Sequence, residues 1–146
     1  MTGSSAIDAE RAFARAARGR RRAALARRLR RAPADSGRLC VFAQPQVSRA
    51  RTRVGGRDGI REIPIEAING TLEPSRAAMF DRGFRPAARA RRRWERVWLA
   101  EHHGATLPPI SVVAVGDGYA VRDGHHRVSV AKARGAVTID ATIDQT

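Results

Sequence analysis

Charged residues are spread very unevenly along this chain, and their distribution limits where a hydrophobic core can form. Residues 1–60 hold 15 arginines against 4 acidic residues, residues 61–109 hold 9 against 6, and residues 110–146 hold 4 basic against 4 acidic residues. A length of 146 residues fits one ordinary domain but not two well-buried ones. We therefore expect one core in the later part of the chain, preceded by a segment that carries the excess basic charge.

Nearly all of the basic charge comes from arginine: the net charge is +14, and the 28 basic residues include one lysine, Lys132. Planar guanidinium groups suit phosphate and carboxylate, so we expect an anionic partner. The single cysteine, Cys40, excludes an internal disulfide. No apolar run approaches the roughly 20 residues of a membrane span, and the first 30 residues lack the apolar stretch of a signal peptide. We expect no membrane partner and a location in the cytoplasm or on the nucleoid.

Residues 1–34 form a basic arm rich in alanine and arginine, two strong helix formers. A thin apolar stripe runs beside its wide arginine face, at Phe13, Ala17, Ala24, Leu25 and Leu29. We expect a helical arm that binds nucleic acid, because each phosphate neutralised by arginine releases counterions. The arginines expected to make these contacts are Arg20, Arg21, Arg22, Arg27, Arg28, Arg30 and Arg31. A solvated tail without a specific target is the alternative.

Residues 35–59 are rich in proline, glycine and serine, which is typical of a linker, and residues 60–146 have the pattern of a compact domain. "REIPIEAI" alternates apolar and polar residues and predicts a strand, with Pro64 at its start or at a sheet edge. "NGTLEPSRAAMFDRGFRP" predicts an extended loop. "AARARRRWERVWLAEHH" predicts a helix that follows Pro86 and ends at Gly104.

The last part of the sequence predicts a hairpin, a helix and a final strand. "LPPISVVAV" and "YAVR" flank the turn "GDG", a helix over residues 126–134 ends at Gly135, and "AVTIDATI" alternates as a strand. The expected fold class is α+β, with a small mixed sheet and two main helices, preceded by the arginine-rich helical arm.

The stretch "VRDGHHRVSVAKARG" joins the second hairpin strand to this helix. It places backbone amides and the positive end of the helix dipole around a glycine, which permits a close approach of phosphate. The guanidinium group of Arg127 can donate two parallel hydrogen bonds to an anion. His125 or His126 can donate a hydrogen bond or move a proton near neutral pH. The predicted phosphate or nucleotide site consists of Arg122, Asp123, Gly124, His125, His126 and Arg127. The alternative is that Asp123 caps the helix, Gly124 makes the turn and the histidines are merely exposed.

The run from about Ile63 to Ile143 resembles the domain shared by ParB partition proteins and sulfiredoxins, in the order strand, loop, helix, "LPPISV", hairpin, "DGHHR", helix and strand. The ParB box reads Gly-Glu-Arg-Arg and cradles nucleotide phosphates, whereas the sulfiredoxin box reads Gly-Cys-His-Arg with the cysteine as nucleophile. Here "GHHR" keeps the glycine and the final arginine, shares His126 with sulfiredoxins, and has His125 in place of Glu or Cys. "FDRGFRP" and "RRRWERV" are also similar to small ParB-like proteins described as nucleases.

The resemblance implies a nucleotide cofactor, CTP or ATP with Mg²⁺, and a connection to chromosome partitioning. Without a cysteine in the box, reduction of a sulfinic acid has no nucleophile. ParB proteins continue into a helix-turn-helix module and a dimerisation domain, while this sequence ends at Thr146, so we do not expect DNA reading by that route. The acidic residue of the box is replaced, which argues against triphosphatase activity; Asp81 and Asp123 are the candidates to take over its role, on position alone.

Other candidate residues lie outside the box. In the resembled fold the long loop faces the phosphate box, so four of its residues either close over a bound base or plug the end of the core. These residues are Phe80, Asp81, Phe84 and Arg85. Trp94 and Trp98, four apart on a helix, predict core positions and not a stacking platform. No spacing of Cys and His matches a structural metal site, so we predict no metal ligands.

Two functions from different classes follow. The first, which we favour, is a binding module that holds a nucleotide or nucleic-acid phosphate at the box while the arm attaches to nucleic acid. The second is an enzyme, a phosphohydrolase or nuclease, in which His125 or His126 acts as general acid or base. Arg122 and Arg127 would then stabilise developing charge.

Overall fold

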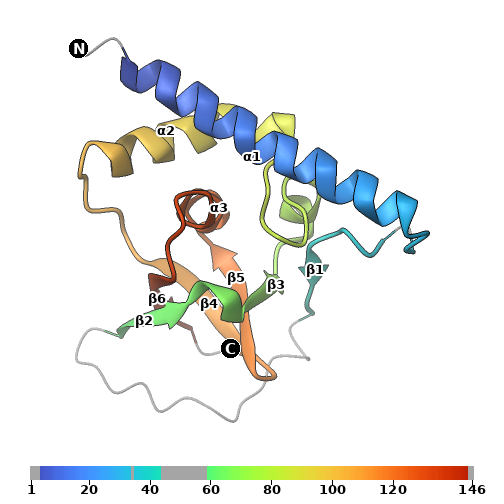
Figure 1. The fold of residues 1–146 in the computed structure, drawn as a ribbon. Coiled ribbons are helices and arrows are strands. Elements are labelled where there is room, and N and C mark those ends of the chain that lie inside the picture. Colours follow the sequence, from blue (N-terminus) through green and yellow to red (C-terminus); the bar gives the residue numbers. More distant parts are fainter. Residues whose placement is uncertain (1–3, 34, 44–58, 145–146) are drawn as a thin grey trace.

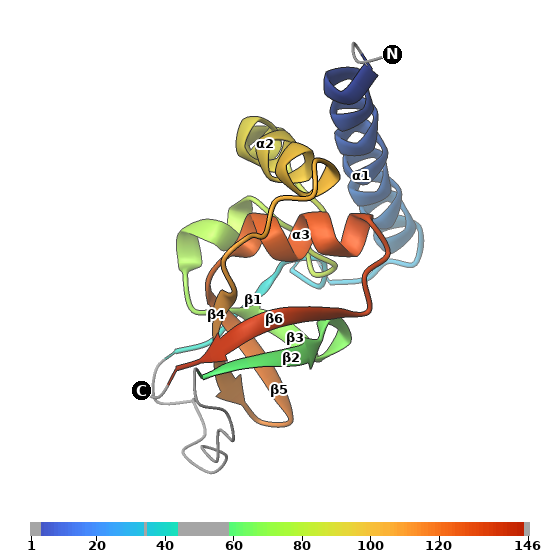
Figure 2. The same ribbon diagram turned by 90° about the vertical axis from the view of Figure 1, so that its left-hand side faces the viewer.

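The computed structural model describes residues 4–33, 35–43 and 59–144. Its elements form three layers (Figures 1 and 2): a six-stranded sheet, α3 (His125–Ala133) across one face, and α1 (Ser4–Leu29) and α2 (Arg91–His102) above α3. Six of the nine residues of α3 are buried. The sequence of α3 is apolar on more than one face because the helix packs against the sheet on one side and α2 on the other.

The sheet is mixed, with strand order β1-β3-β5-β4-β6-β2. The strands are β1 (Cys40–Val41), β2 (Ile60–Pro64), β3 (Ile68–Thr71), β4 (Ile110–Val115), β5 (Gly118–Asp123) and β6 (Thr138–Ile143). β4 and β5 form the expected antiparallel hairpin at the centre, and β6 joins β4 in parallel. β2 pairs antiparallel with β6, while β1 and β3 extend the sheet in parallel beside β5. The predicted α+β class with a small mixed sheet is confirmed.

The arginine-rich segment is helical as expected, and the first half of this helix is docked on the body. Ala9, Ala12 and Phe13 are buried. The Phe13 ring meets the Trp94 ring of α2 edge to face, with centroids 5.6 Å apart. Farther along α1, Leu25 is exposed. The apolar stripe therefore packs in its first half and is open to solvent in its second half.

Both tryptophans of α2 belong to the core, as predicted. Trp94 is fully buried, and its indole Nε1 donates a 2.8 Å hydrogen bond to Oγ of Ser129 on α3. Trp98 is also buried and stacks on the imidazole of His102, with centroids 4.7 Å apart. The hydrogen bond from Trp94 to Ser129 joins α2 to α3, which in turn lies on the sheet.

The alternating residues after position 60 form two strands and not one. A 3-10 turn at Ile65–Ala67 separates β2, at one edge of the sheet, from β3 near the other edge. Pro64 has no amide hydrogen with which to continue the ladder. β3 lies at the start of the segment predicted to be an extended loop. Gly70 in β3 has no side chain that could contribute to an alternating pattern. A side chain does not fit there, because the carbonyl oxygen of Cys40 on β1 occupies the space.

Composition assigns residues 35–59 to a linker, but residues 35–43 contribute to the fold. Leu39 is a buried member of the core, and the next two residues form β1. A short apolar run in a polar, glycine-containing context gave too little signal to separate it from the linker. The remainder, residues 44–58, lies outside the described residues.

Candidate anion-binding site

The "GHHR" box lies where the centre of the sheet meets α3. β5 ends at Asp123, Gly124 has a φ of 107°, and α3 begins at His125. A Cβ atom at position 124 would lie 2.5 Å from Cγ2 of Ile110 on β4, so both the backbone conformation and the space require glycine. The strand, turn and helix of the sequence prediction are present at this point.

The first turn of α3 has no side-chain cap. Gly124 is the N-cap residue, and no side chain accepts a hydrogen bond there. Asp123 therefore does not cap the helix, and both histidines are buried, which removes the alternative of a capped turn with exposed imidazoles. The first amide groups of an α-helix have no partner within the helix. They remain available for an anion, on which the helix dipole also acts favourably.

A cavity of about 270 Å³ opens beside this turn. Five residues of the predicted site line it, namely Asp123, Gly124, His125, His126 and Arg127. Arg76 and Arg93 add two further guanidinium groups, and Val97, Leu107 and Pro108 form apolar wall. Three arginines against one carboxylate give the cavity a positive potential, which favours an anionic ligand.

His125 is held in the interior. Its Nε2 atom lies 2.6 Å from Oγ1 of Thr71 on β3, and its ring stacks on Phe80 with centroids 6.4 Å apart. Burial, followed by the positive charges of Arg76 and His126, lowers its pKa to about 4, although Asp123 acts in the opposite sense. A neutral imidazole with a hydrogen-bond partner is suited to holding β3 against α3. It is poorly suited to moving protons at pH 7.

His126 differs from its neighbour in one respect. Its Nε2 atom is buried and has no hydrogen-bond partner in the described part of the chain, although the residue lines the cavity. Its ring meets Phe80 edge to face, with centroids 5.1 Å apart. Burial, then Arg93 and Arg76, lowers its pKa to about 4. An unpaired buried polar atom is costly, and such atoms in native proteins usually mark a ligand or water site.

Arg127 is engaged in the wall of the cavity. Its Nη1 atom donates to the carbonyl oxygen of Pro109 at 3.0 Å and also to that of Pro108. Its Nη2 atom lies 3.1 Å from Oδ2 of Asp123. The guanidinium therefore fixes the loop that leads into β4 and has few donors left for a ligand.

Arg122 is directed elsewhere. Its guanidinium lies 3.2 Å from Oδ2 of Asp144, beyond the end of β6, and the residue does not line the cavity. Successive residues of a strand point to opposite faces, so Arg122 and Asp123 cannot both face the same space. The structure thus brings five of the six predicted box residues together.

The loop residues predicted to face the box plug the core. Phe80 and Phe84 are fully buried, with ring centroids 6.3 Å apart, and neither lines this cavity. Asp81 is also buried, and its Oδ1 atom accepts hydrogen bonds from the amides of Gly83 and Arg85. Asp81 therefore stabilises a turn, and the structure does not place it where it could hold a nucleotide-bound metal.

Two residues that line the cavity, Arg76 and Arg93, were not predicted from the sequence. Arg76 lies in a 3-10 turn, Pro74–Ala78, where no periodic pattern identifies the inward side. Arg93 is one of three consecutive arginines at the start of α2. Helical periodicity could have identified Arg93. Residues four apart lie on the same face of a helix, and Val97, four residues later, lines the same cavity.

Two further features bear on ligands. In the described ranges, no helix is long and apolar enough to cross a bilayer. No three His, Cys, Asp or Glu side chains meet there in a group that could hold a metal ion.

Of the seven arm arginines, Arg27 and Arg30 line a separate cavity between α1 and the loop at residues 82–85.

No model of a protein family and no curated protein matches the chain. A solved structure to which the chain is similar is described as "Crystal structure of Sulfiredoxin from Arabidopsis thaliana". The two share 22% identity at a TM-score of 0.44, over 60% of this chain and 85% of that chain. At this level of similarity, function has to be argued from the residues of this chain.

Proposed function

We propose that this protein is a ParB-like phosphate-binding module that associates with nucleic acid through its basic N-terminal helix. The observation that carries the proposal is the cavity at the start of α3. Uncapped amides, Gly124 and the unpaired Nε2 atom of His126 meet there with Arg76 and Arg93, two arginines that form no ion pair with any described residue. The oxygen atoms of an oxyanion would accept hydrogen bonds from the amides, from the imidazole and from the two guanidinium groups.

The volume of the cavity favours a particular part of the ligand. At about 270 Å³ it falls just below the range of roughly 300–1,000 Å³ that is usual for drug-sized ligands. A phosphate or diphosphate group fits this space, while the rest of a nucleotide or nucleic acid extends outside. The candidate ligands are therefore CTP, ATP or a nucleic-acid phosphate.

The residues fit phosphate better than they fit a metal ion. Asp123 is the one carboxylate among the lining residues, and it is paired with Arg127. Mg²⁺ is commonly held by one or two carboxylates together with phosphate oxygens and water. A nucleotide-bound Mg²⁺ would therefore rest chiefly on its own phosphates, with Asp123 as the nearest protein ligand.

A phosphohydrolase or nuclease is the second candidate, and the unpaired Nε2 atom of His126 is the observation in its favour. A general base is most effective when its pKa lies near the working pH. The pKa of His126 is lowered to about 4, which makes the free imidazole a weak base at pH 7. Binding without turnover is therefore the function we favour.

Helix α1 would contribute to nucleic-acid binding through the positive charge of its arginines. Of the seven arm arginines, five are exposed, and Arg20 and Arg27 are partly buried. Because the first half of α1 packs on the body, removing the segment would uncover the core. Substitution of exposed arginines, and not deletion, is the informative test of nucleic-acid binding.

Calorimetric titration with CTP, ATP, GTP and pyrophosphate tests the phosphate site. Arg93→Gln should weaken binding about tenfold or more, since a hydrogen bond to a charged group contributes about 1.5–3 kcal/mol. Arg92→Gln is the matched control, because Arg92 is the preceding residue of α2, is exposed and does not line the cavity. Equal effects of the two substitutions would contradict the proposed site.

A parallel turnover assay with nucleotides and plasmid DNA separates the two candidates. Loss of binding in Arg93→Gln with no turnover by the wild type supports the module. Turnover by the wild type that disappears in His126→Ala supports the enzyme.

A further inference from the structure

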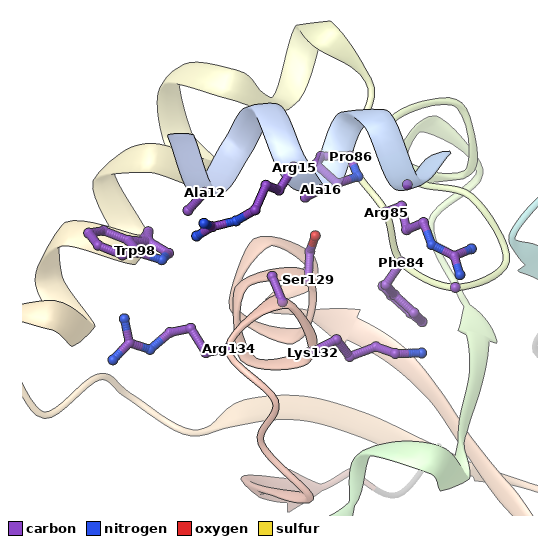
Figure 3. Close-up of a pocket in the computed structure, with 13 residues that line it drawn as sticks. Ala12, Arg15, Ala16, Phe84, Arg85, Pro86, Trp98, Ser129, Lys132 and Arg134 are labelled. Carbon is purple, nitrogen blue, oxygen red and sulfur yellow. The ribbon is translucent and has the colours of Figure 1, made fainter. Parts of the chain in front are cut away.

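A second concave region runs along the inner side of α1, apart from the "GHHR" box. It begins with a cleft of about 650 Å³ between α1, α3 and the loop at residues 83–86, with Trp98 at one end (Figure 3). A second cavity, of about 480 Å³, continues toward the C-terminal end of α1. The two cavities adjoin at Gly83 and Arg85, which line both, and together they are called the groove below.

The charged residues that line this groove are all basic. Those of the first cavity are Arg15, Arg85, Lys132 and Arg134. Those added by the second cavity are Arg27, Arg30 and Arg82. They come from α1, from the loop and from the end of α3, so the fold gathers charges from three separate parts of the sequence.

Two of these cations are already paired. Arg85 lies 3.4 Å from Asp81, and Arg134 lies 3.4 Å from Glu101. The guanidinium of Arg134 also covers the Trp98 ring, 5.4 Å from its centroid, so that ring is not open for stacking of a base.

The other cations of the groove are not neutralised within the described ranges. Arg15, Arg30 and Lys132 form no ion pair there. Figure 3 shows Arg15 extending from α1 toward the Trp98 side of the cleft, and Lys132 on the Phe84 side. A concave surface lined by charges of one sign focuses the electric field and attracts counterions.

We propose that this groove binds the sugar–phosphate backbone of a nucleic-acid strand. Arg30 directly follows the end of α1 and lies 15 positions after Arg15, which corresponds to about 22 Å at 1.5 Å per residue. Each strand of B-form DNA has one phosphate per about 3.4 Å of helix axis, and the spacing along the winding backbone is larger, so the groove spans at most about six phosphates. That length matches a polymer better than a small anion, and arginine's forked donors suit phosphate oxygens.

This inference rests on the proposed association with nucleic acid and changes where the contact lies. A basic tail presents charge on all sides. The groove instead combines one edge of α1 with the C-terminal end of α3 and the loop at residues 82–86, neither of which belongs to the predicted basic arm. Exposed arginines on the outer side of α1 should consequently matter less than those in the groove.

The single lysine of the chain provides a direct test with the wild-type protein. An amine-reactive acylating reagent can modify only Nζ of Lys132 and the α-amino group. A bound oligonucleotide should slow acylation of Lys132 about fivefold or more, because the phosphate backbone covers the groove. Single-stranded and duplex oligonucleotides are compared to identify the preferred form. Protection by pyrophosphate that equals protection by the oligonucleotide would instead indicate a small-anion pocket and overturn the inference.

Two triple variants with equal change of charge provide a second test. The groove variant is Arg15→Gln, Arg30→Gln and Lys132→Gln. The control is Arg11→Gln, Arg18→Gln and Arg22→Gln, three exposed positions of α1 that line neither cavity. The groove variant should reduce the slope of log K against log salt by about two, and the control by less than about one, since each lost phosphate contact removes about 0.7–0.9.

The outcomes separate this inference from the proposed function. If the wild type binds oligonucleotide and both variants lose the same slope, the groove inference fails while association through the basic helix stands. If the wild type does not bind oligonucleotide at all, association with nucleic acid fails as well. Thermal unfolding of each variant checks that the fold is kept.

Discussion

The Oγ1 atom of Thr71 on β3 lies 2.6 Å from the Nε2 atom of His125 in the first turn of α3, and both residues are buried. The same oxygen accepts a 2.8 Å hydrogen bond from the amide of Glu73. One hydroxyl therefore fastens the sheet to the helix that carries the candidate site. Thr71 gave no functional signal in the sequence, because a single threonine in a short strand is unremarkable.

Thr71→Val should destabilise the fold by about 1–3 kcal/mol, because it leaves the buried imidazole of His125 without its partner. Urea unfolding measures the change. Thr106→Val, at an exposed position in the loop before β4, should change the free energy of unfolding by less than about 0.5 kcal/mol. If the two variants were equally stable, His125 would not depend on this contact.

The stability of the fold should fall as the pH is lowered from about 6.5 to about 4. In the folded state the pKa values of His125 and His126 are lowered to about 4 from an ordinary 6.5. Between these values the unfolded chain binds more protons than the folded chain, so acid favours unfolding. The expected loss is on the order of 1–3 kcal/mol for each histidine, complete near pH 4 and absent above pH 6.5.

Urea unfolding at several pH values tests this expectation. His126→Gln should lessen the dependence on pH between 6.5 and 4, whereas His103→Gln, at an exposed position, should preserve it. Saturating pyrophosphate should raise the stability throughout this interval, because a bound anion stabilises the folded state by mass action. A wild-type stability that does not change with pH over this interval would refute the assignment of neutral buried imidazoles.

Gly124→Ala should destabilise the protein more than Gly104→Ala does. Both glycines have positive φ, 107° and 78°, so both substitutions strain the backbone by about 1–3 kcal/mol. An added Cβ at Gly104 meets nothing within 4 Å, but at Gly124 it lies 2.5 Å from Ile110. Chemical denaturation should therefore show an additional cost of about 1 kcal/mol or more at position 124. Equal costs would mean that only backbone strain acts at the turn.

Phe13→Ala tests whether α1 is docked. The side chain is buried against Trp94, so its removal should cost about 3–5 kcal/mol. Leu29→Ala, at the exposed end of the same helix, should cost less than about 0.5 kcal/mol. Thermal or urea unfolding provides both values, and a negligible effect of Phe13→Ala would indicate an independent arm.

Local signals allowed much of the fold to be predicted. The turn glycines, the apolar runs on either side of "GDG", the alternation in β6 and the apolar phase of α2 depend on neighbours in sequence. The same signals placed Gly124 at the junction of strand and helix. They failed where contacts between residues far apart in the sequence determine the structure. The strand Ile68–Thr71 is an example, because it pairs with β1 and β5 and no pattern within the segment itself indicates this pairing.

The candidate site was predictable only in part, for the same reason. Residues of the box are consecutive, so the sequence identified them together. Arg76 reaches the cavity from a 3-10 turn that contacts β3, and Arg93 reaches it from α2, which packs over α3. Arg122 and Arg127 show the converse, since both lie in the box yet their guanidinium groups are engaged by Asp144 and by Asp123 with the loop carbonyls.

Helix α3 is shared by both regions of positive potential. Its first residues line the cavity at the box, and Ser129, Lys132 and Arg134 line the groove beside α1. Seven residues, or about 10 Å of rigid helix, separate His125 from Lys132. A ligand long enough to reach both the cavity and the groove would bind more tightly than a ligand that reaches one of them. Because the helix holds the two regions at a fixed distance, no entropy of a flexible linker is lost when both are occupied.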